Sequence, residues 1–113
     1  MADAETRAHF APLRKPIDAI LHDRRSGARL RISIVALARE GMSFVADRSL
    51  PPGSTWTLVV RRIPAASIPA RIRSSRAFER DTFTCDAELG AARGEGRAHF
   101  DALLPPVAAR ETV

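Results

Sequence analysis

The side chains that could carry out chemistry in this chain are few and widely spaced. The histidines are His9, His22 and His99, and the one cysteine is Cys85. A zinc site needs two or more such ligands at short spacing, and none of these residues has a second ligand close by in the sequence. The carboxylates are scattered, and no glycine-rich loop leads into a Lys-Ser or Lys-Thr pair that would hold a phosphate. The sequence therefore predicts no metal site, no cofactor and no enzyme.

Basic side chains are the chemical group in excess. The formal net charge is +5, and of the 18 basic residues all but Lys15 are arginines. Arginine forks bind phosphate and carboxylate groups in a bidentate manner, so a cluster of them would make an anion-binding surface. The arginines are spread along the chain rather than run together, which favours solvated surface positions for most of them.

Alternation of apolar and polar residues predicts the elements that would position these side chains. Six segments show a period of two, which is typical of half-buried strands, and they cover residues 17–23, 28–36, 42–47, 55–62, 68–73 and 82–89. Turn residues separate several of them, as in the segment Leu50-Pro51-Pro52-Gly53. The alternation places Trp56 and Cys85 in the core. It places Asp86 and Glu88 on the outer face, where they could lie across from Arg71 and Arg73.

The predicted fold class is mostly β, a six-stranded antiparallel barrel with a C-terminal helix. Prolines at positions 12 and 16 favour an irregular segment over residues 7–16. The predicted organisation is a flexible N-terminal arm over 1–13, a barrel domain over 14–104 and a flexible tail over 105–113. A short helix over 97–104 would cover one end or face of the barrel.

Several absences in the sequence suggest a compartment. A lone cysteine allows no intrachain disulfide, which fits a reducing environment. No apolar run approaches the roughly 20 residues that span a membrane, and the first residues show no apolar signal core. We therefore expect a cytoplasmic protein that does not insert into a membrane.

The segment Glu40-Gly41-Met42-Ser43-Phe44-Val45, followed by Leu50-Pro51-Pro52-Gly53-Ser54, resembles the PilZ family. The resemblance extends over the feature order from Arg14 to Leu104, about four fifths of the chain. It implies a six-stranded antiparallel barrel with a helix, in agreement with the strand count. It also implies a role in bacterial signalling, because many PilZ domains are receptors for cyclic di-GMP.

The resemblance implies two ligand motifs, and this sequence departs from both. In the arm motif Arg-x-x-x-Arg, Arg14 matches the second arginine, but Phe10 occupies the first position. In the turn motif [Asp/Asn]-x-Ser-x-x-Gly, Gly41 matches the glycine, whereas Ala36 and Ala38 replace the polar residues. Losing one charge-assisted and two neutral hydrogen bonds removes about 3–5 kcal/mol of binding free energy, or roughly two to three decades or more of affinity. We expect weak or absent binding of cyclic di-GMP.

Three functions fit these observations. The first is a non-catalytic adaptor that binds a protein partner in signalling or motility through an exposed sheet edge or the helix. The second is a genuine cyclic di-GMP receptor whose candidate ligand-binding residues are Arg7, Arg14, Lys15, Arg39 and Gly41. The third is a nucleic-acid-binding barrel that uses outward-facing arginines at positions 29, 31, 71 and 73. The absence of tyrosine and the few aromatic residues argue against the third, because single-strand binders usually stack bases on aromatic rings.

Overall fold

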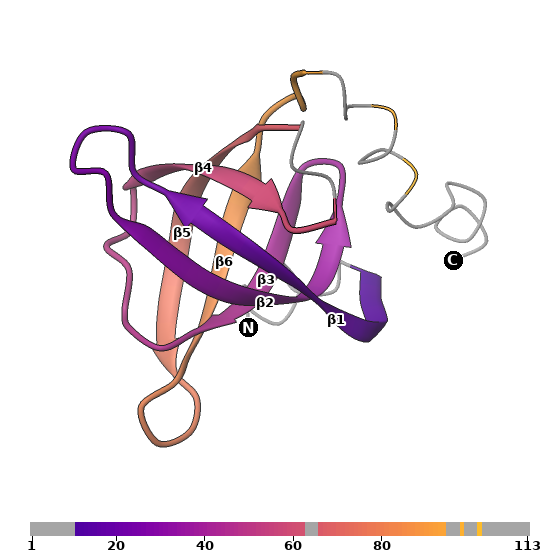
Figure 1. The fold of residues 1–113 in the computed structure, drawn as a ribbon. Coiled ribbons are helices and arrows are strands. Elements are labelled where there is room, and N and C mark those ends of the chain that lie inside the picture. Colours follow the sequence, from indigo (N-terminus) through magenta and orange to yellow (C-terminus); the bar gives the residue numbers. More distant parts are fainter. Residues whose placement is uncertain (1–10, 63–65, 95–97, 99–101, 103–113) are drawn as a thin grey trace.

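The computed structural model describes residues 11–62, 66–94, 98 and 102, and within these residues it shows six strands in one antiparallel sheet (Figure 1). The strands are β1 (Ala11–His22), β2 (Arg29–Ala38), β3 (Gly41–Ala46), β4 (Thr55–Val60), β5 (Ile68–Ala77) and β6 (Phe83–Leu89). The prediction of a mostly β fold with six antiparallel strands is confirmed. The predicted helix over 97–104 lies, apart from Ala98 and Ala102, outside the described residues, as does the predicted tail over 105–113.

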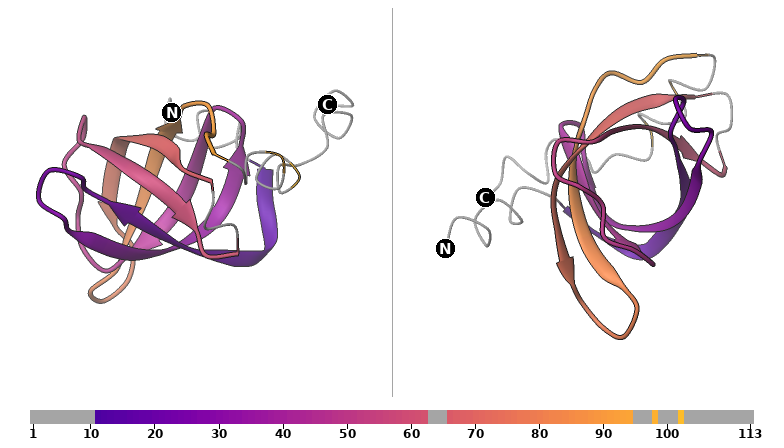
Figure 2. Two further views of the ribbon diagram at one scale, coloured as in Figure 1. Left: turned by 45° about the horizontal axis from the view of Figure 1, so that its top comes forward. Right: turned by 90° about the vertical axis from the view of Figure 1, so that its left-hand side faces the viewer.

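Every one of the six strands pairs with two others, so the sheet closes on itself. The order around the ring is β1-β2-β3-β6-β5-β4, and β4 returns to pair with β1. The view along the ring in Figure 2 (right) shows the strands curling around a common interior. Closure satisfies the backbone hydrogen bonds of strands that would otherwise be edges.

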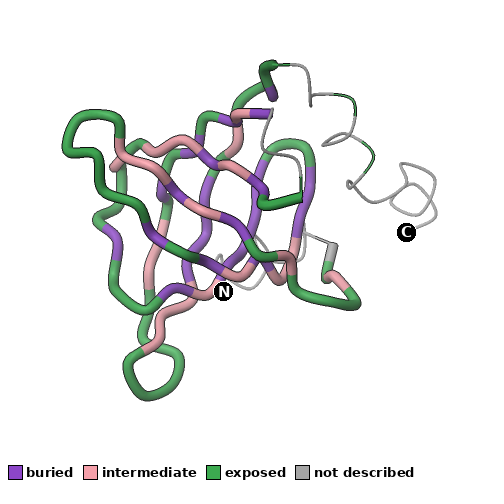
Figure 3. Tube along the Cα trace, in the orientation of Figure 1, coloured by how far each residue is buried: buried purple, intermediate pink, exposed green. Residues whose placement is uncertain are grey.

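The core fills the inside of this ring, because successive side chains of a strand point to opposite faces and the apolar ones point inward. On β2 the side chains of Leu30, Ile32 and Ile34 are buried while Arg29 and Arg31 are exposed, as the sequence predicts. The first six residues of β5 alternate in the same way, whereas β3 is buried along almost its whole length (Figure 3). Cys85 is also in the core, with no exposed surface, and burial raises the pKa of its thiol. Its predicted role as a packing residue is confirmed.

The first strand begins earlier than the sequence suggests. The irregular segment predicted over 7–16 and the flexible arm predicted over 1–13 are wrong from residue 11 onward, because Ala11 and Pro12 pair with Leu37 and Ala36 of β2. Pairing then stops and resumes at Ile17 opposite Ile34, so residues 13–16 of β1 face Val35 alone. Such a bulge leaves backbone groups without ladder partners. Pro16, which has no N–H to donate, can therefore be accommodated there.

Two side chains differ from their predicted burial. Asp86, predicted on the outer face, is only 6 % exposed, and a register shift between Ile72 and Ser74 of β5 places Ser74 opposite it. Trp56, predicted in the core, is partly buried and packs against the rim of the core. The predicted pairing of β5 with β6 is confirmed. Arg71 lies opposite Glu88, and Arg73 Nε approaches Glu88 Oε1 to 3.6 Å.

Candidate functional site

The residues of the predicted cyclic di-GMP site lie on β1 and around the turn between β2 and β3. Arg14 and Lys15 are exposed in the bulge of β1. Arg39 is exposed in the two-residue turn, and Gly41 is buried as the first residue of β3. Arg7 lies outside the described residues. The register places Pro12 opposite Ala36, so the structure brings the bulged segment alongside the strand that carries the second motif.

The two motif positions on β2 carry alanines in place of hydrogen-bonding side chains. Ala36 is opposite Ser43 on β3, and Ala38 is opposite Gly41 with no exposed surface. The methyl groups of both alanines can neither donate nor accept a hydrogen bond. Gly41 does not have the positive φ that would make glycine necessary in a turn. The predicted site therefore keeps the exposed cationic side chains of Arg14, Lys15 and Arg39, but its two motif positions on β2 carry alanines.

A second concave surface lies at the opposite end of β2, beside the turn that joins β1 to β2. It is a cleft of about 680 Å³. The end of β1 and its turn supply His22, Asp23, Arg24 and Arg25. The segment that leads into and begins β4 supplies residues 53–57, and the chain around β5 supplies Ser67, Pro69 and Arg93. Pairing in register explains the assembly, because Thr57 of β4 lies between His22 of β1 and Pro69 of β5.

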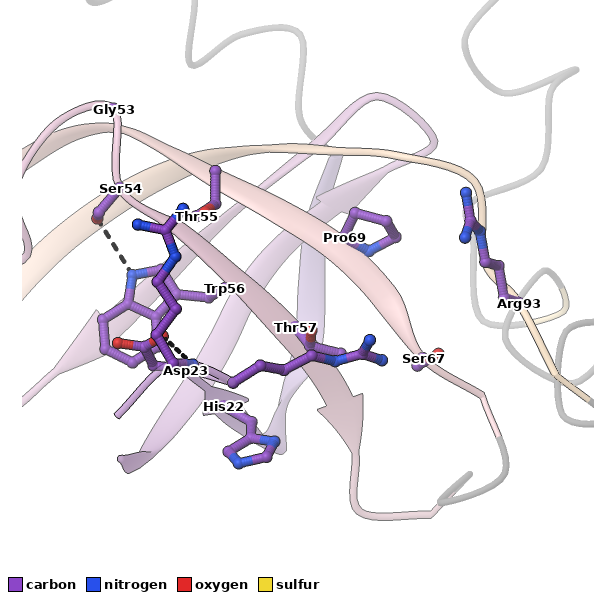
Figure 4. Close-up of a pocket in the computed structure, with 12 residues that line it drawn as sticks. His22, Asp23, Gly53, Ser54, Thr55, Trp56, Thr57, Ser67, Pro69 and Arg93 are labelled. Atoms are coloured by element: carbon purple, nitrogen blue, oxygen red, sulfur yellow. Dashed lines mark hydrogen bonds between the residues drawn. The ribbon is translucent and has the colours of Figure 1, made fainter. Parts of the chain in front are cut away.

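Trp56 is held at one end of this cleft by the turn before it. Its indole Nε1–H donates a hydrogen bond of 3.1 Å to Ser54 Oγ, and the Ser54 hydroxyl in turn donates one of 2.6 Å to the carbonyl of Pro51. Gly53 makes the turn possible with φ of +87°, a conformation that glycine adopts without steric cost. Figure 4 shows Trp56 beside Ser54, with Arg93 at the other end of the cleft. The orientation of the indole ring is thus fixed by residues of its own turn.

The turn that presents Arg24 and Arg25 is fastened by Asp23. One carboxylate oxygen accepts a 3.0 Å hydrogen bond from the Arg25 backbone N–H, and the other accepts one of 2.9 Å from the Ser26 hydroxyl. The bond from the Arg25 backbone is the main reason why the pKa of Asp23 lies below its usual value. The positive charge of Arg25 also contributes to this lowering of the pKa, although Asp23 forms no ion pair closer than 4 Å with Arg24 or Arg25.

Arg93 is anchored to the start of β5 through its backbone. Its N–H donates to the carbonyl of Ser67 and its carbonyl accepts from the Ser67 N–H, both at 2.9 Å. Among the described residues, the ion pairs closer than 4 Å are Arg48–Asp47 and Arg73–Glu88. Arg24, Arg25 and Arg93 are exposed and belong to neither of these pairs, so their guanidinium groups can bind an external anion.

Sequence reasoning did not identify this cleft. The adjacent pair Arg24-Arg25, between the segments 17–23 and 28–36, was the visible signal, and Trp56 was assigned to the core. The pairing of β1 with β4, which brings the turn beside Trp56, joins strands separated by two others in the sequence. Alternation patterns predict which face of a strand is buried, but they do not predict which strands are neighbours.

Metal and membrane chemistry find no support in the part of the chain that the structure describes. These residues contain no group of three or more His, Cys, Asp or Glu side chains that could hold a metal ion. They also contain no helix long and apolar enough to cross a bilayer.

No protein-family model matches the chain, and neither a curated protein nor a solved structure does.

Proposed function

We propose that this protein is a PilZ-like binding adaptor in bacterial cyclic di-GMP-linked signalling, non-catalytic and with weak or absent binding of the dinucleotide. The observation that carries the proposal is the environment of Ala36 and Ala38. They lie on β2 next to the bulged segment of β1, where the resemblance implies polar ligand-binding side chains, but Ala36 has only a methyl group and Ala38 is fully buried. The six-stranded antiparallel ring supports the same resemblance at the level of architecture.

An adaptor needs a surface that a protein partner can recognise, and the hairpin between β5 and β6 supplies one. Phe78 is 59 % exposed there, the one large hydrophobic side chain with this exposure among the described residues. Arg80 lies two residues further on, also exposed. Aromatic residues and arginine are the side chains that most often dominate binding energy at protein interfaces. This hairpin replaces the sheet edge as the expected contact, because ring closure leaves no described strand without partners on both sides.

The arrangement of arginines argues against the nucleic-acid alternative. Arg29 and Arg31 point outward from β2, and Arg71 and Arg73 point outward from β5. In the ring order, β2 and β5 are three positions apart in either direction, so the two pairs lie on opposite walls. They do not form the continuous basic stripe along which a phosphate backbone could bind.

Thermal unfolding with and without cyclic di-GMP separates the adaptor from the receptor alternative. A receptor with the dinucleotide at a hundred times its Kd would gain about 2.7 kcal/mol of stability, which raises Tm by roughly 10 °C for a domain of this size. We expect no measurable shift at 0.1 mM dinucleotide, a concentration chosen as about 100 times a micromolar Kd. A clear rise that disappears in Arg14→Ala would support the receptor and reject the adaptor proposal.

A further inference from the structure

We propose that the cleft between the β1–β2 turn and β4 binds a small phosphorylated ligand with a flat aromatic ring, of the nucleotide class. The cleft is distinct from the predicted dinucleotide site, because the β1–β2 turn and the β2–β3 turn lie at opposite ends of β2. The inference goes beyond the proposed adaptor function and does not depend on it. Its size, its charge and its single aromatic ring each point to this ligand class.

The size of the cleft favours a small ligand over a protein surface. Its volume of about 680 Å³ lies within the roughly 300–1,000 Å³ of small-molecule sites. The lining comes from three stretches of chain around β1, β4 and β5, and from Arg93. A standard protein interface needs roughly 20–30 residues on each side, more than this cleft provides.

The charge of the cleft favours an anion with more than one negative charge. The guanidinium groups of Arg24, Arg25 and Arg93 oppose a single carboxylate, that of Asp23, whose oxygens are already hydrogen-bonded within the turn. Arg93 lies at the other end of the cleft from Trp56 (Figure 4). Hydroxyl groups of Thr55, Thr57 and Ser67 line the space between the two ends. Forked guanidinium groups with nearby hydroxyls suit the oxygens of phosphate groups.

Trp56 favours a flat ring as the other part of the ligand. It is the only tryptophan in the chain and is partly buried, and its Nε1–H bond to Ser54 restrains the ring. A restrained indole can stack a heterocycle with little further loss of conformational freedom. The combination of an oriented indole at one end with arginines along the cleft distinguishes this site from a plain basic patch.

The single tryptophan makes the proposal directly testable by fluorescence. ATP is the probe, tripolyphosphate is the matched anion without a ring, and adenosine is the ring without an anion. We expect ATP to quench Trp56 emission in a saturable titration, with at least tenfold weaker binding of adenosine and of tripolyphosphate. Equal competition by tripolyphosphate, or binding of ATP without a change in Trp56 emission, would show an anion patch alone and overturn the proposal.

Matched variants locate the binding. Arg24→Gln combined with Arg93→Gln should weaken ATP binding at least tenfold, whereas Arg80→Gln, on the distant β5–β6 hairpin, should leave it unchanged. A Trp56→Leu variant, followed by isothermal titration, should lose the preference for ATP over tripolyphosphate. All variants are first checked for an unchanged β-type circular dichroism spectrum. Equal affinities of the cleft and hairpin variants, or much tighter binding of single-stranded DNA than of ATP at 150 mM salt, would reject the assignment.

Discussion

At the scale of single residues, Asp86 is a useful residue to test because the alternation pattern did not predict its burial. Asp86 is buried between β3 and β5, where it accepts hydrogen bonds from Ser43 Oγ at 2.5 Å and Ser74 Oγ at 3.2 Å. The interaction compensates the carboxylate for its loss of water, and within the described residues no buried side-chain N or O atom is left without a partner. The sequence gives no sign of this, because Asp86 sits at an outward position of an otherwise regular alternation.

Replacing Asp86 with alanine should leave the Ser43 hydroxyl buried without its partner. We expect Asp86→Ala to lower the free energy of unfolding by about 1–3 kcal/mol, measured by urea denaturation. Glu88→Ala is the matched control on the same strand, since Glu88 is exposed and its ion pair with Arg73 is solvent-accessible. The control should change stability by less than about 1 kcal/mol. Equal effects of the two substitutions would mean that the buried hydrogen bonds contribute little.

At the scale of elements, the turn before β4 fixes the position of Trp56 at the cleft, and Gly53 is the most constrained residue of this turn. A Cβ added there would meet no atom within 4 Å, so the cost of substitution comes from the backbone conformation at φ of +87° rather than from crowding. Gly53→Ala should therefore destabilise the protein by roughly 1–2 kcal/mol, because L-residues disfavour this conformation. Gly53→Asn should cost less, since asparagine adopts it more readily.

Thermal or urea unfolding of the two Gly53 variants checks this expectation. Gly90→Ala is a contrasting variant, because its cost would come from contact of the new Cβ with Pro69 at 3.3 Å and not from a positive φ. If Gly53→Ala were as stable as the parent chain, the turn would not need a left-handed residue at this position.

Much of the strand arrangement could be predicted from sequence, and the exceptions have physical reasons. The alternation over residues 28–36 places Ile32 and Ile34 on one face, and both are buried, because a half-buried strand must separate apolar from polar positions. Bulges and register shifts leave no such trace. The bulge in β1 hid the strand character of residues 11–16, and the shift in β5 changed the residue opposite Asp86 from the predicted arginine to Ser74. The cleft could not be predicted because it depends on the pairing of β1 with β4.

At the scale of the whole molecule, the closed ring separates three surfaces from one another. The Arg14 bulge is near the β2–β3 turn, the cleft adjoins the β1–β2 turn, and Phe78 is on the hairpin that extends beyond β5 and β6 (Figure 1). Because these surfaces do not share residues, substitutions at one should leave the others intact. A ring held together by neighbouring pairings on all sides is expected to unfold in one cooperative transition.

The exposed hairpin provides the whole-molecule test of the adaptor role. Phe78→Ser should change Tm by no more than a few degrees, since the side chain is largely exposed. It should weaken binding to the physiological protein partner at least tenfold, measured with the purified partner by isothermal titration. Arg48→Gln, an exposed substitution elsewhere on the barrel, should leave that affinity unchanged. A partner that binds the Phe78→Ser variant and the parent chain equally would place the docking surface elsewhere.

The most direct test of the central claim restores the missing ligand-binding groups. We propose that this six-stranded ring is related to cyclic di-GMP receptors but lacks their polar ligand-binding side chains. Isothermal titration should show no saturable binding of cyclic di-GMP by the parent chain at micromolar concentrations. The triple variant Phe10→Arg, Ala36→Asp, Ala38→Ser, if its melting curve shows that it is folded, should bind at least a hundredfold more tightly. Micromolar binding by the parent chain that Arg14→Ala abolishes, or no gain in the folded variant, would contradict the account.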